Sequence, residues 1–348
     1  MEQNQTPHKR RVRYSGTHPK RFEEKYKELN PEKYQGDVEK IIKSGKTPAG
    51  MHISIMVNEI LEFLDIQPGQ IGYDATLGYG GHSQKMLEKL QGKGHLYATD
   101  VDPIESEKTR KRLESLGYGP EILTIKRINF ARLDEVAPEE KFDFVLADLG
   151  VSSMQIDNPD RGFTFKYDGP LDLRLDPTAG VSAAERLREL DQEELAAMLV
   201  ENSDEPYADR IAKAVMQVYK RGGTIETTKQ FASIIEGALS FLPPKEKKEA
   251  VKKSCQRCFQ ALRIDVNSEF EVLYDFLDKL PGVLKSGGRV AVLTFHSGED
   301  RLVKKAFKQG LKEGIFSEIC EDVIRPSAEE CFQNPRAKST KMRWAIKA

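Results

Sequence analysis

Asp74-Ala-Thr-Leu-Gly78-Tyr-Gly80-Gly81-His82-Ser83 joins a β-rich run to a helical pattern, with only a glycine turn between them. Glycines at such a turn let the backbone approach a ligand closely, and the start of a helix presents free N–H groups to polar or anionic atoms. The spacing lacks the G-x-G-x-x-G order of a dinucleotide phosphate site, which argues against a nicotinamide-dependent oxidoreductase. A glycine turn that binds no ligand is the alternative.

Outward from this turn, short β-rich runs alternate with helical stretches, which predicts an α/β fold with a doubly wound parallel sheet. The expected strands are residues 71–77, 95–100, 122–127, 142–149 and 288–296. Apolar residues at helical spacing predict helices at residues 82–91, between the first two strands, and at 55–64, before the sheet.

The fourth and fifth expected strands lie about 140 residues apart, far more than the roughly 10 to 15 residues of a crossover helix. The intervening sequence has helical spacing, with Ser182 and Asp191 as expected N-caps and Gly222-Gly223 at a helix end. Pro243-Pro244, followed by a run of Lys and Glu, predicts an exposed connection. We therefore expect a basic extension at residues 1–48, a core at 49–154 and 254–348, and an inserted helical domain for substrate recognition at 155–253.

The 348 residues are 39% hydrophobic and 31% charged, which is typical of a globular protein. The sequence has neither an apolar run of membrane-spanning length nor the apolar core of a signal peptide, so we expect a cytoplasmic protein without a membrane partner. The four cysteines do not form a disulfide framework. Cys255 and Cys258 supply only half of a zinc site, and because Cys320 and Cys331 would have to converge on them, we expect no metal.

Charge is unevenly distributed along the chain. Residues 1–48 hold 12 Lys and Arg against 7 Asp and Glu, or +5, and residues 251–348 hold 18 against 13, also +5, whereas the middle is acidic. The basic segments 8–14 and 336–343 are suited to neutralise RNA phosphates. Solvated termini are the alternative.

Acidic or aromatic residues follow three further strands. Asp100 comes about 20 residues after the glycine turn, where a carboxylate binds the hydroxyls of a ribose; a helix N-cap is the alternative. Phe130 follows the third strand, where an aromatic ring can pack against adenine or simply join the core. Asp148 ends the fourth strand, at the edge where such sheets bind ligands.

At this point the chain resembles the bacterial methyltransferases that modify the exocyclic N4 of a cytosine in 16S ribosomal RNA, the MraW or RsmH family. The resemblance covers residues 51–343 and rests on seven blocks in the family's order: GYGGHS, ATDVDP, DLGVSSMQID, RGFTFKYDGPLDLRLDP, RCFQALRIDVNSE, TFHSGEDRLVK and NPRAKSTKMR. It implies a Rossmann-like methyltransferase sheet, S-adenosylmethionine as cofactor, and ribosomal RNA as partner, free or within the small ribosomal subunit. It also implies a set of cofactor-binding residues: Gly80, Gly81, His82, Asp100, Phe130, Asp148 and Gln155.

The chain departs from the family at several positions. It has Leu77, Met154 and Gly298 where the family usually has Phe, Pro and Leu, and residues 253–257 replace a His-Pro-Ala-Thr-Arg segment. These departures, with the extension at residues 1–48, leave open a paralogue that methylates a different RNA cytosine.

Residues 161–172 mix aromatic, basic and acidic side chains directly after the fourth strand, a mixture that suits an unstacked base. A loop packed against its own aromatics is the alternative. Arg161 and Asp168 are the substrate candidates from this loop. His296 and Asp300 join them because they follow the fifth strand at the same edge, where loops carry function.

The amine of cytosine is a weak nucleophile, so catalysis depends mainly on alignment and on an acceptor for an N–H hydrogen bond. The expected acceptor is Asp148 or a backbone carbonyl near residues 149–152, and Asp148 is the expected catalytic residue. A non-catalytic RNA-binding protein that keeps the fold is the alternative, but Asp100 and Asp148 argue against it.

Overall fold

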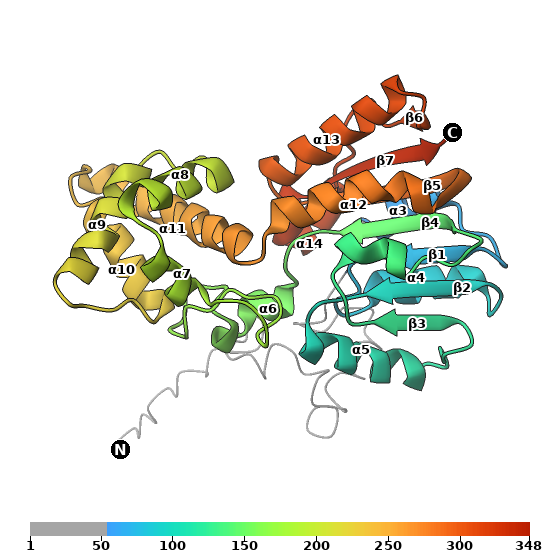
Figure 1. Ribbon diagram of the computed structural model, residues 1–348, viewed down its shortest axis with the longest axis horizontal. Coiled ribbons are helices and arrows are strands. Elements are labelled where there is room, and N and C mark those ends of the chain that lie inside the picture. The colour runs from blue at the N-terminus through green and yellow to red at the C-terminus, as the bar shows by residue number, and fades with distance from the viewer. Residues whose placement is uncertain (1–53) are drawn as a thin grey trace, which may run out of the picture. The chain divides into compact units, whose positions relative to one another are not determined.

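The computed structural model describes residues 54–348, so the expected extension at residues 1–48 lies outside the described residues. Seven strands form one sheet in the order β3-β2-β1-β4-β5-β7-β6. Strands β1 to β5 pair in parallel, and β7 pairs antiparallel with both β5 and β6. Their bounds are β1 (Ile71–Asp74), β2 (His95–Thr99), β3 (Leu123–Lys126), β4 (Phe142–Asp148), β5 (Leu284–Thr294), β6 (Phe316–Ile319) and β7 (Lys341–Lys347). The predicted Rossmann-like doubly wound sheet is confirmed (Figure 1).

Helices cover both faces of this sheet because side chains alternate along each strand. On β4, Phe144 and Leu146 pack in one hydrophobic cluster, and Val145 and Ala147 pack in another. The first cluster includes side chains of α3 (Val57–Leu64), α4 (Gly81–Leu90) and α5 (Pro103–Ser115). The second includes side chains of η2 (Phe130–Glu135), α12 (Glu269–Val283) and α13 (Ser297–Lys312).

The residues between β4 and α12 are mostly helical, and they build a third hydrophobic cluster of their own. Ser182 and Asp191 each cap a helix with a capping box, as expected. None of the described helices is both long enough and apolar enough to cross a membrane. The helices are α6 (Ser153–Asp157), α7 (Ala183–Glu189), α8 (Gln192–Ser203), α9 (Ala208–Lys220), α10 (Thr228–Ala238) and α11 (Pro244–Val266), with the short η3 (Pro159–Arg161) after α6.

Pro243-Pro244 is exposed, as expected, but the run of Lys and Glu after it is helical and not a connection. Pro244 is the first residue of α11, a 23-residue helix that continues through residue 253, where the sequence suggested a domain boundary. Proline is well suited to the first turn of a helix, because backbone N–H groups there have no partner within the helix and the φ of proline is already helical.

The basic C-terminal segment does not lie free along its whole length. Residues 341–347 form β7, between β5 and β6, and Arg343 is only 6% exposed. Lys341 and Arg343 both pair with Asp300, at 3.0 and 2.7 Å. These two cations are therefore already paired within the protein.

A buried carboxylate connects the sheet to the segment that leads into the helices. Asp102 caps α5 by accepting hydrogen bonds from the backbone N–H groups of Ile104 and Glu105. Its Oδ2 atom also accepts hydrogen bonds from Arg161 Nη1, at 2.6 Å, and from Gln155 Nε2, at 2.9 Å. The side chains of Asp102 and Arg161 are 1% and 8% exposed. This ion pair holds the loop after β4 against the start of α5.

Replacing Arg161 with Met should destabilise the protein by about 3 to 5 kcal/mol, because the Asp102 carboxylate would stay buried without its cation. Arg132→Met is the matched control, since Arg132 pairs with Glu135 at an exposed site, where losing the ion pair should cost far less stability. Denaturant unfolding of both variants measures the difference. Equal losses would contradict a structural role for the buried pair.

Candidate active site

Three carboxylates lie at the carboxyl edge of neighbouring strands. Asp74 ends β1, Asp100 directly follows β2, and Asp148 ends β4. Asp74 lies opposite Ala98 of β2 and Leu146 of β4 in the sheet register. The arrowheads of β2, β3 and β4 point to this same edge in Figure 1. The structure thus brings the ends of the three strands together, as parallel pairing requires.

The glycine turn after β1 has left-handed backbone at Gly78 and Gly80, with φ of 49° and 75°. A Cβ atom on Gly80 would lie 2.6 Å from Thr109 Cγ2, and one on Gly81 would lie 2.0 Å from Ser54 Oγ. The protein's own packing therefore explains both Gly80 and Gly81. The first N–H groups of α4, which begins at Gly81, remain oriented toward the turn.

Asp100 accepts two backbone hydrogen bonds, from Gly78 N–H at 2.7 Å and from Asp102 N–H at 2.8 Å. Burial raises the pKa of Asp100 to about 6, although both hydrogen bonds act to lower it. Asp102, not Asp100, is the N-cap of α5, so the N-cap alternative for Asp100 is wrong. Asp100 instead ties the glycine turn to the end of β2.

Asp148 faces His82, with 3.4 Å between Asp148 Oδ2 and His82 Nδ1. The Nε2 atom of His82 lies 2.9 Å from the carbonyl oxygen of Ile55, to which it donates a proton. Burial alone would lower the pKa of His82, but the hydrogen bond and charge of Asp148 outweigh it and raise the pKa. The other carboxylate oxygen, Oδ1 of Asp148, is buried and has no hydrogen-bond partner in the described part of the chain.

Gln155 and Arg161 both donate hydrogen bonds to the carboxylate of Asp102. The Gln155 amide donates to Asp102 and accepts from Ser152 N–H at 2.9 Å, within the capping box of α6. Arg161 Nη2 also donates to the carbonyl oxygens of Arg174 and Leu175. Both side chains hold this loop in place through protein contacts.

Phe130 begins η2 a few residues after β3, where Asn129 caps the turn. Its ring is partly buried and packs edge-on against Phe276 of α12, with 5.3 Å between ring centroids. The Phe130 ring therefore packs against the hydrophobic cluster that includes α12.

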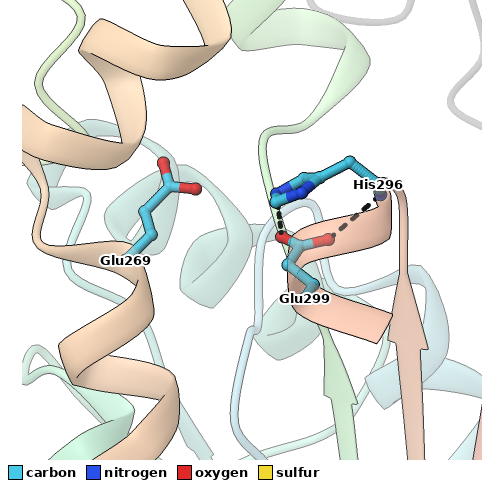
Figure 2. A group of neighbouring side chains, drawn as sticks. All are labelled: Glu269, His296 and Glu299. Atoms are coloured by element: carbon cyan, nitrogen blue, oxygen red, sulfur yellow. Dashed lines mark hydrogen bonds and ion pairs between the residues drawn. The ribbon is translucent and has the colours of Figure 1, made fainter. Parts of the chain in front are cut away.

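His296 precedes α13 and comes three residues after Leu293, which pairs with Asp148 where β4 and β5 lie side by side. Figure 2 shows the His296 ring beside Glu299, with Glu269 of α12 across from them. His296 Nε2 lies 3.3 Å from Glu299 Oε1, yet neither ring nitrogen makes a well-aligned hydrogen bond to a described residue. The ring is close enough for an ion pair when it is protonated.

Glu269, His296 and Glu299 are also the one group of metal-ligand type found among residues 54–348, with ligand atoms within 4.8 Å of one another. Both oxygens of Glu269 already accept hydrogen bonds from Arg263, at 2.8 and 2.9 Å. This partly buried guanidinium already supplies Glu269 with a positive charge.

The two remaining substrate candidates have structural partners. Asp300 is held by Lys341 and Arg343, and although burial acts to raise the pKa of Asp300, these two cations lower it. Asp168 accepts a hydrogen bond from Lys229 N–H in the first turn of α10 and is exposed. The structure does not bring these two carboxylates into the edge formed by β1, β2 and β4.

Several residues of this region were missed in the sequence. Asp74 is buried and accepts hydrogen bonds from Ser83 Oγ at 2.5 Å and Thr76 N–H at 3.1 Å, and burial raises its pKa. Its position at the end of a strand was a usable signal. Asp102 has no comparable signal, because its partners Gln155 and Arg161 lie 53 and 59 residues away in the sequence. Arg263 and Glu299 pair locally, with Glu269 and His296, and were overlooked.

The comparisons with known proteins agree with this architecture. The sequence pattern of the MraW methylase family matches residues 49–348. Ribosomal RNA small subunit methyltransferase H 1 of Agathobacter rectalis is 68% identical, with 98% of each chain covered. Ribosomal RNA small subunit methyltransferase H 2 of Alkaliphilus metalliredigens is 62% identical over all of both chains. Ribosomal RNA small subunit methyltransferase H of Thioalkalivibrio sulfidiphilus is 39% identical, covering 87% of this chain and 98% of its own. The chain therefore belongs to the MraW methylase family.

Proposed function

We propose that this protein transfers a methyl group from S-adenosylmethionine to the exocyclic N4 of a cytosine in 16S ribosomal RNA. The names of relatives that share 62% and 68% of its residues support a small-subunit ribosomal RNA substrate. The observation that carries the chemistry is the buried Oδ1 atom of Asp148, which has no hydrogen-bond partner in residues 54–348. An acceptor of this kind, at the ligand-binding edge of the sheet, suits an amine that must be held by its N–H.

The edge residues fit the cofactor. Asp100 uses one lone pair of each oxygen for backbone N–H groups and keeps others for the ribose hydroxyls. Phe130 borders the adenine, and Asp148 lies at the methionine end. Gly80, Gly81 and His82 shape the turn between them, whereas Gln155 acts by holding the loop after β4. When bound, S-adenosylmethionine supplies an electrophilic methyl group on a positively charged sulfur.

Positioning is the main catalytic task of the chain's own residues, because the cytosine amine is a weak nucleophile. Asp148 Oδ1 accepts an N–H hydrogen bond from that amine and so orients its lone pair. His82 fixes the other oxygen of the same carboxylate, and Ile55 fixes His82. No strong base is required, since the nitrogen becomes acidic as it is methylated.

The helices inserted at residues 155–253 help to grip the RNA, while the core at 49–154 and 254–348 holds the cofactor. Support for this division is the separate hydrophobic cluster of the helices. His296, near the β4 loop, is the best placed of the four substrate candidates. The RNA is bound free or within the small subunit, which puts the reaction in the cytoplasm.

Replacing Asp100 with Ala should weaken S-adenosylmethionine binding about 10- to 100-fold, since a charge-assisted hydrogen bond is worth roughly 1.5 to 3 kcal/mol. Calorimetry measures the affinity, and Asp160→Ala, at an exposed carboxylate, is the control. An unchanged affinity in a folded Asp100→Ala protein would exclude the ribose contact.

The pH dependence of binding follows from the pKa of about 6 at Asp100. Because folding raises the pKa of Asp100, the protonated carboxyl stabilises the folded protein at low pH. This contribution to the free energy of unfolding is lost as the pH rises through 6. Ribose hydroxyls favour the charged form, so affinity should fall up to about tenfold per unit as the pH drops below 6 and stay level above it. In Asp100→Ala this component should disappear. The same decline in both proteins would assign it to another group.

Asp148→Asn preserves shape but removes the charged acceptor, so kcat should fall about 10- to 100-fold through misalignment of the amine. Steady-state rates at saturating cofactor measure kcat, and calorimetry reports whether cofactor binding has also changed. A kcat within twofold of the wild type would mean that another group accepts the N–H hydrogen bond.

The deciding experiment maps modified cytidines by mass spectrometry in RNA from cells with and without the protein. We expect N4-methylation of a 16S cytidine to disappear in its absence. Loss at a different RNA cytidine would favour the paralogue, and no loss at all would favour a non-catalytic RNA-binding protein.

A further inference from the structure

Phe332 is the most exposed of the large hydrophobic side chains in residues 54–348, at 88%. It lies on α14 (Ala328–Gln333), which Ser327 caps by accepting a hydrogen bond from Glu330 N–H at 3.1 Å. The next turn, η4 (Pro335–Ser339), is capped in the same way by Asn334. Two capped helical turns therefore carry the exposed ring.

Two contacts attach this segment near the active site. Arg336 Nη2 donates to Asp157 Oδ1 at 2.7 Å, and Asp157 is the last residue of α6. This helix begins at Ser153, five residues after Asp148. Glu330 Oε1 accepts a second hydrogen bond, from Met56 N–H at 2.8 Å. The segment that carries Phe332 is thus fixed to the loop that leaves the catalytic end of β4.

Charges of both signs accompany the ring along the chain. Residues 325–343 hold five Lys and Arg against two Glu. Asp300 neutralises two of these cations and Asp157 pairs with Arg336, which leaves Arg325 and Lys338 beside Glu329 and Glu330. Arg325 and Lys338 are exposed and form no ion pair with any residue in the described range. These two charges remain available to a phosphate.

We propose that Phe332 is a stacking platform for an unpaired base of the RNA substrate, with Arg325 and Lys338 contacting the phosphates beside it. This inference rests on the proposed function and assigns a place where the RNA is held. An exposed ring binds any base by its π-face, and adjacent cations follow the backbone, which is how single-stranded nucleic acid is bound without sequence readout. The attachment to α6 would direct the flanking nucleotides toward Asp148.

Tyr274 provides a matched contrast. It is also highly exposed, at 65%, but it lies on α12 beside Glu271 and Asp275. These residues line a cavity of about 570 Å³ together with Glu201, Asp204 and one cation, Arg301. The four carboxylates outnumber this cation and have no ion-pair partner among the described residues, so the cavity should repel phosphates. Phe332 and Tyr274 are therefore both exposed, but they differ in the charge of the side chains around them.

The test measures binding of a labelled single-stranded RNA by the full-length protein at several salt concentrations, together with methylation of unmodified small-subunit ribosomal RNA. Phe332→Ala should weaken RNA binding about 5- to 150-fold, because stacking on one base is worth roughly 1 to 3 kcal/mol, and should leave the salt slope unchanged. Lys338→Ala should lower the salt slope by about 0.7. Both variants should bind S-adenosylmethionine normally.

Two further substitutions identify the kind of contact. Phe332→Trp should retain RNA binding and Phe332→Leu should not, because only the former keeps a π-face. Tyr274→Ala should bind RNA like the wild type. Wild-type RNA affinity in Phe332→Ala, or equal binding by the Leu and Trp variants, would overturn the inference; the second result would indicate an apolar contact with a protein. If the wild-type protein methylates no ribosomal RNA, the proposed function fails, whatever Phe332 does.

Discussion

The buried Asp102 carboxylate is the constraint on which the rest of the site depends. It caps α5, accepts hydrogen bonds from Arg161 and Gln155, and its backbone N–H holds Asp100 at 2.8 Å. One residue thereby connects the end of β2, the start of α6 and the entry to the inserted helices. Removing the cation from a buried ion pair is strongly destabilising, so the fold keeps Arg161 in position. These contacts also hold the loop after β4 in place.

The electrostatics of the edge follow from the gathering of three carboxylates in one place. Burial raises the pKa of Asp74 and of Asp100, which means that the fold works against their negative charge. His82 offsets part of this charge at Asp148, and its own pKa rises in return. A ligand with a positive sulfur would relieve the same repulsion. The repulsion between these carboxylates destabilises the site without a ligand. The same repulsion would favour a positively charged cofactor.

The sequence predicted the framework better than the contacts. Strands β1 to β5 were expected because their apolar runs are bounded by turn signals, but β6 and β7 were missed: β6 has four residues, and β7 carries Lys341, Arg343 and Lys347. The helix at Pro244 was mistaken for a connection because proline was treated only as a helix breaker. Arg161 and Asp300 were chosen as substrate residues from their position along the chain. Their ion pairs join residues 59 and 43 positions apart, and no local pattern encodes such partners.

The order of the last strands affects how the protein can fold during synthesis. β7 lies between β5 and β6 although it follows both in the chain, so β6 has no partner until the ribosome has translated β7. Until then the outer edge of β5 stays open, with unsatisfied backbone groups that can pair with another nascent chain. Asp300 likewise has no Arg343 to pair with until that part of the chain has been translated. A growing chain that already contains every expected cofactor-binding residue would therefore still lack a closed sheet, and premature termination upstream of β7 would leave an aggregation-prone fragment rather than a partly active enzyme.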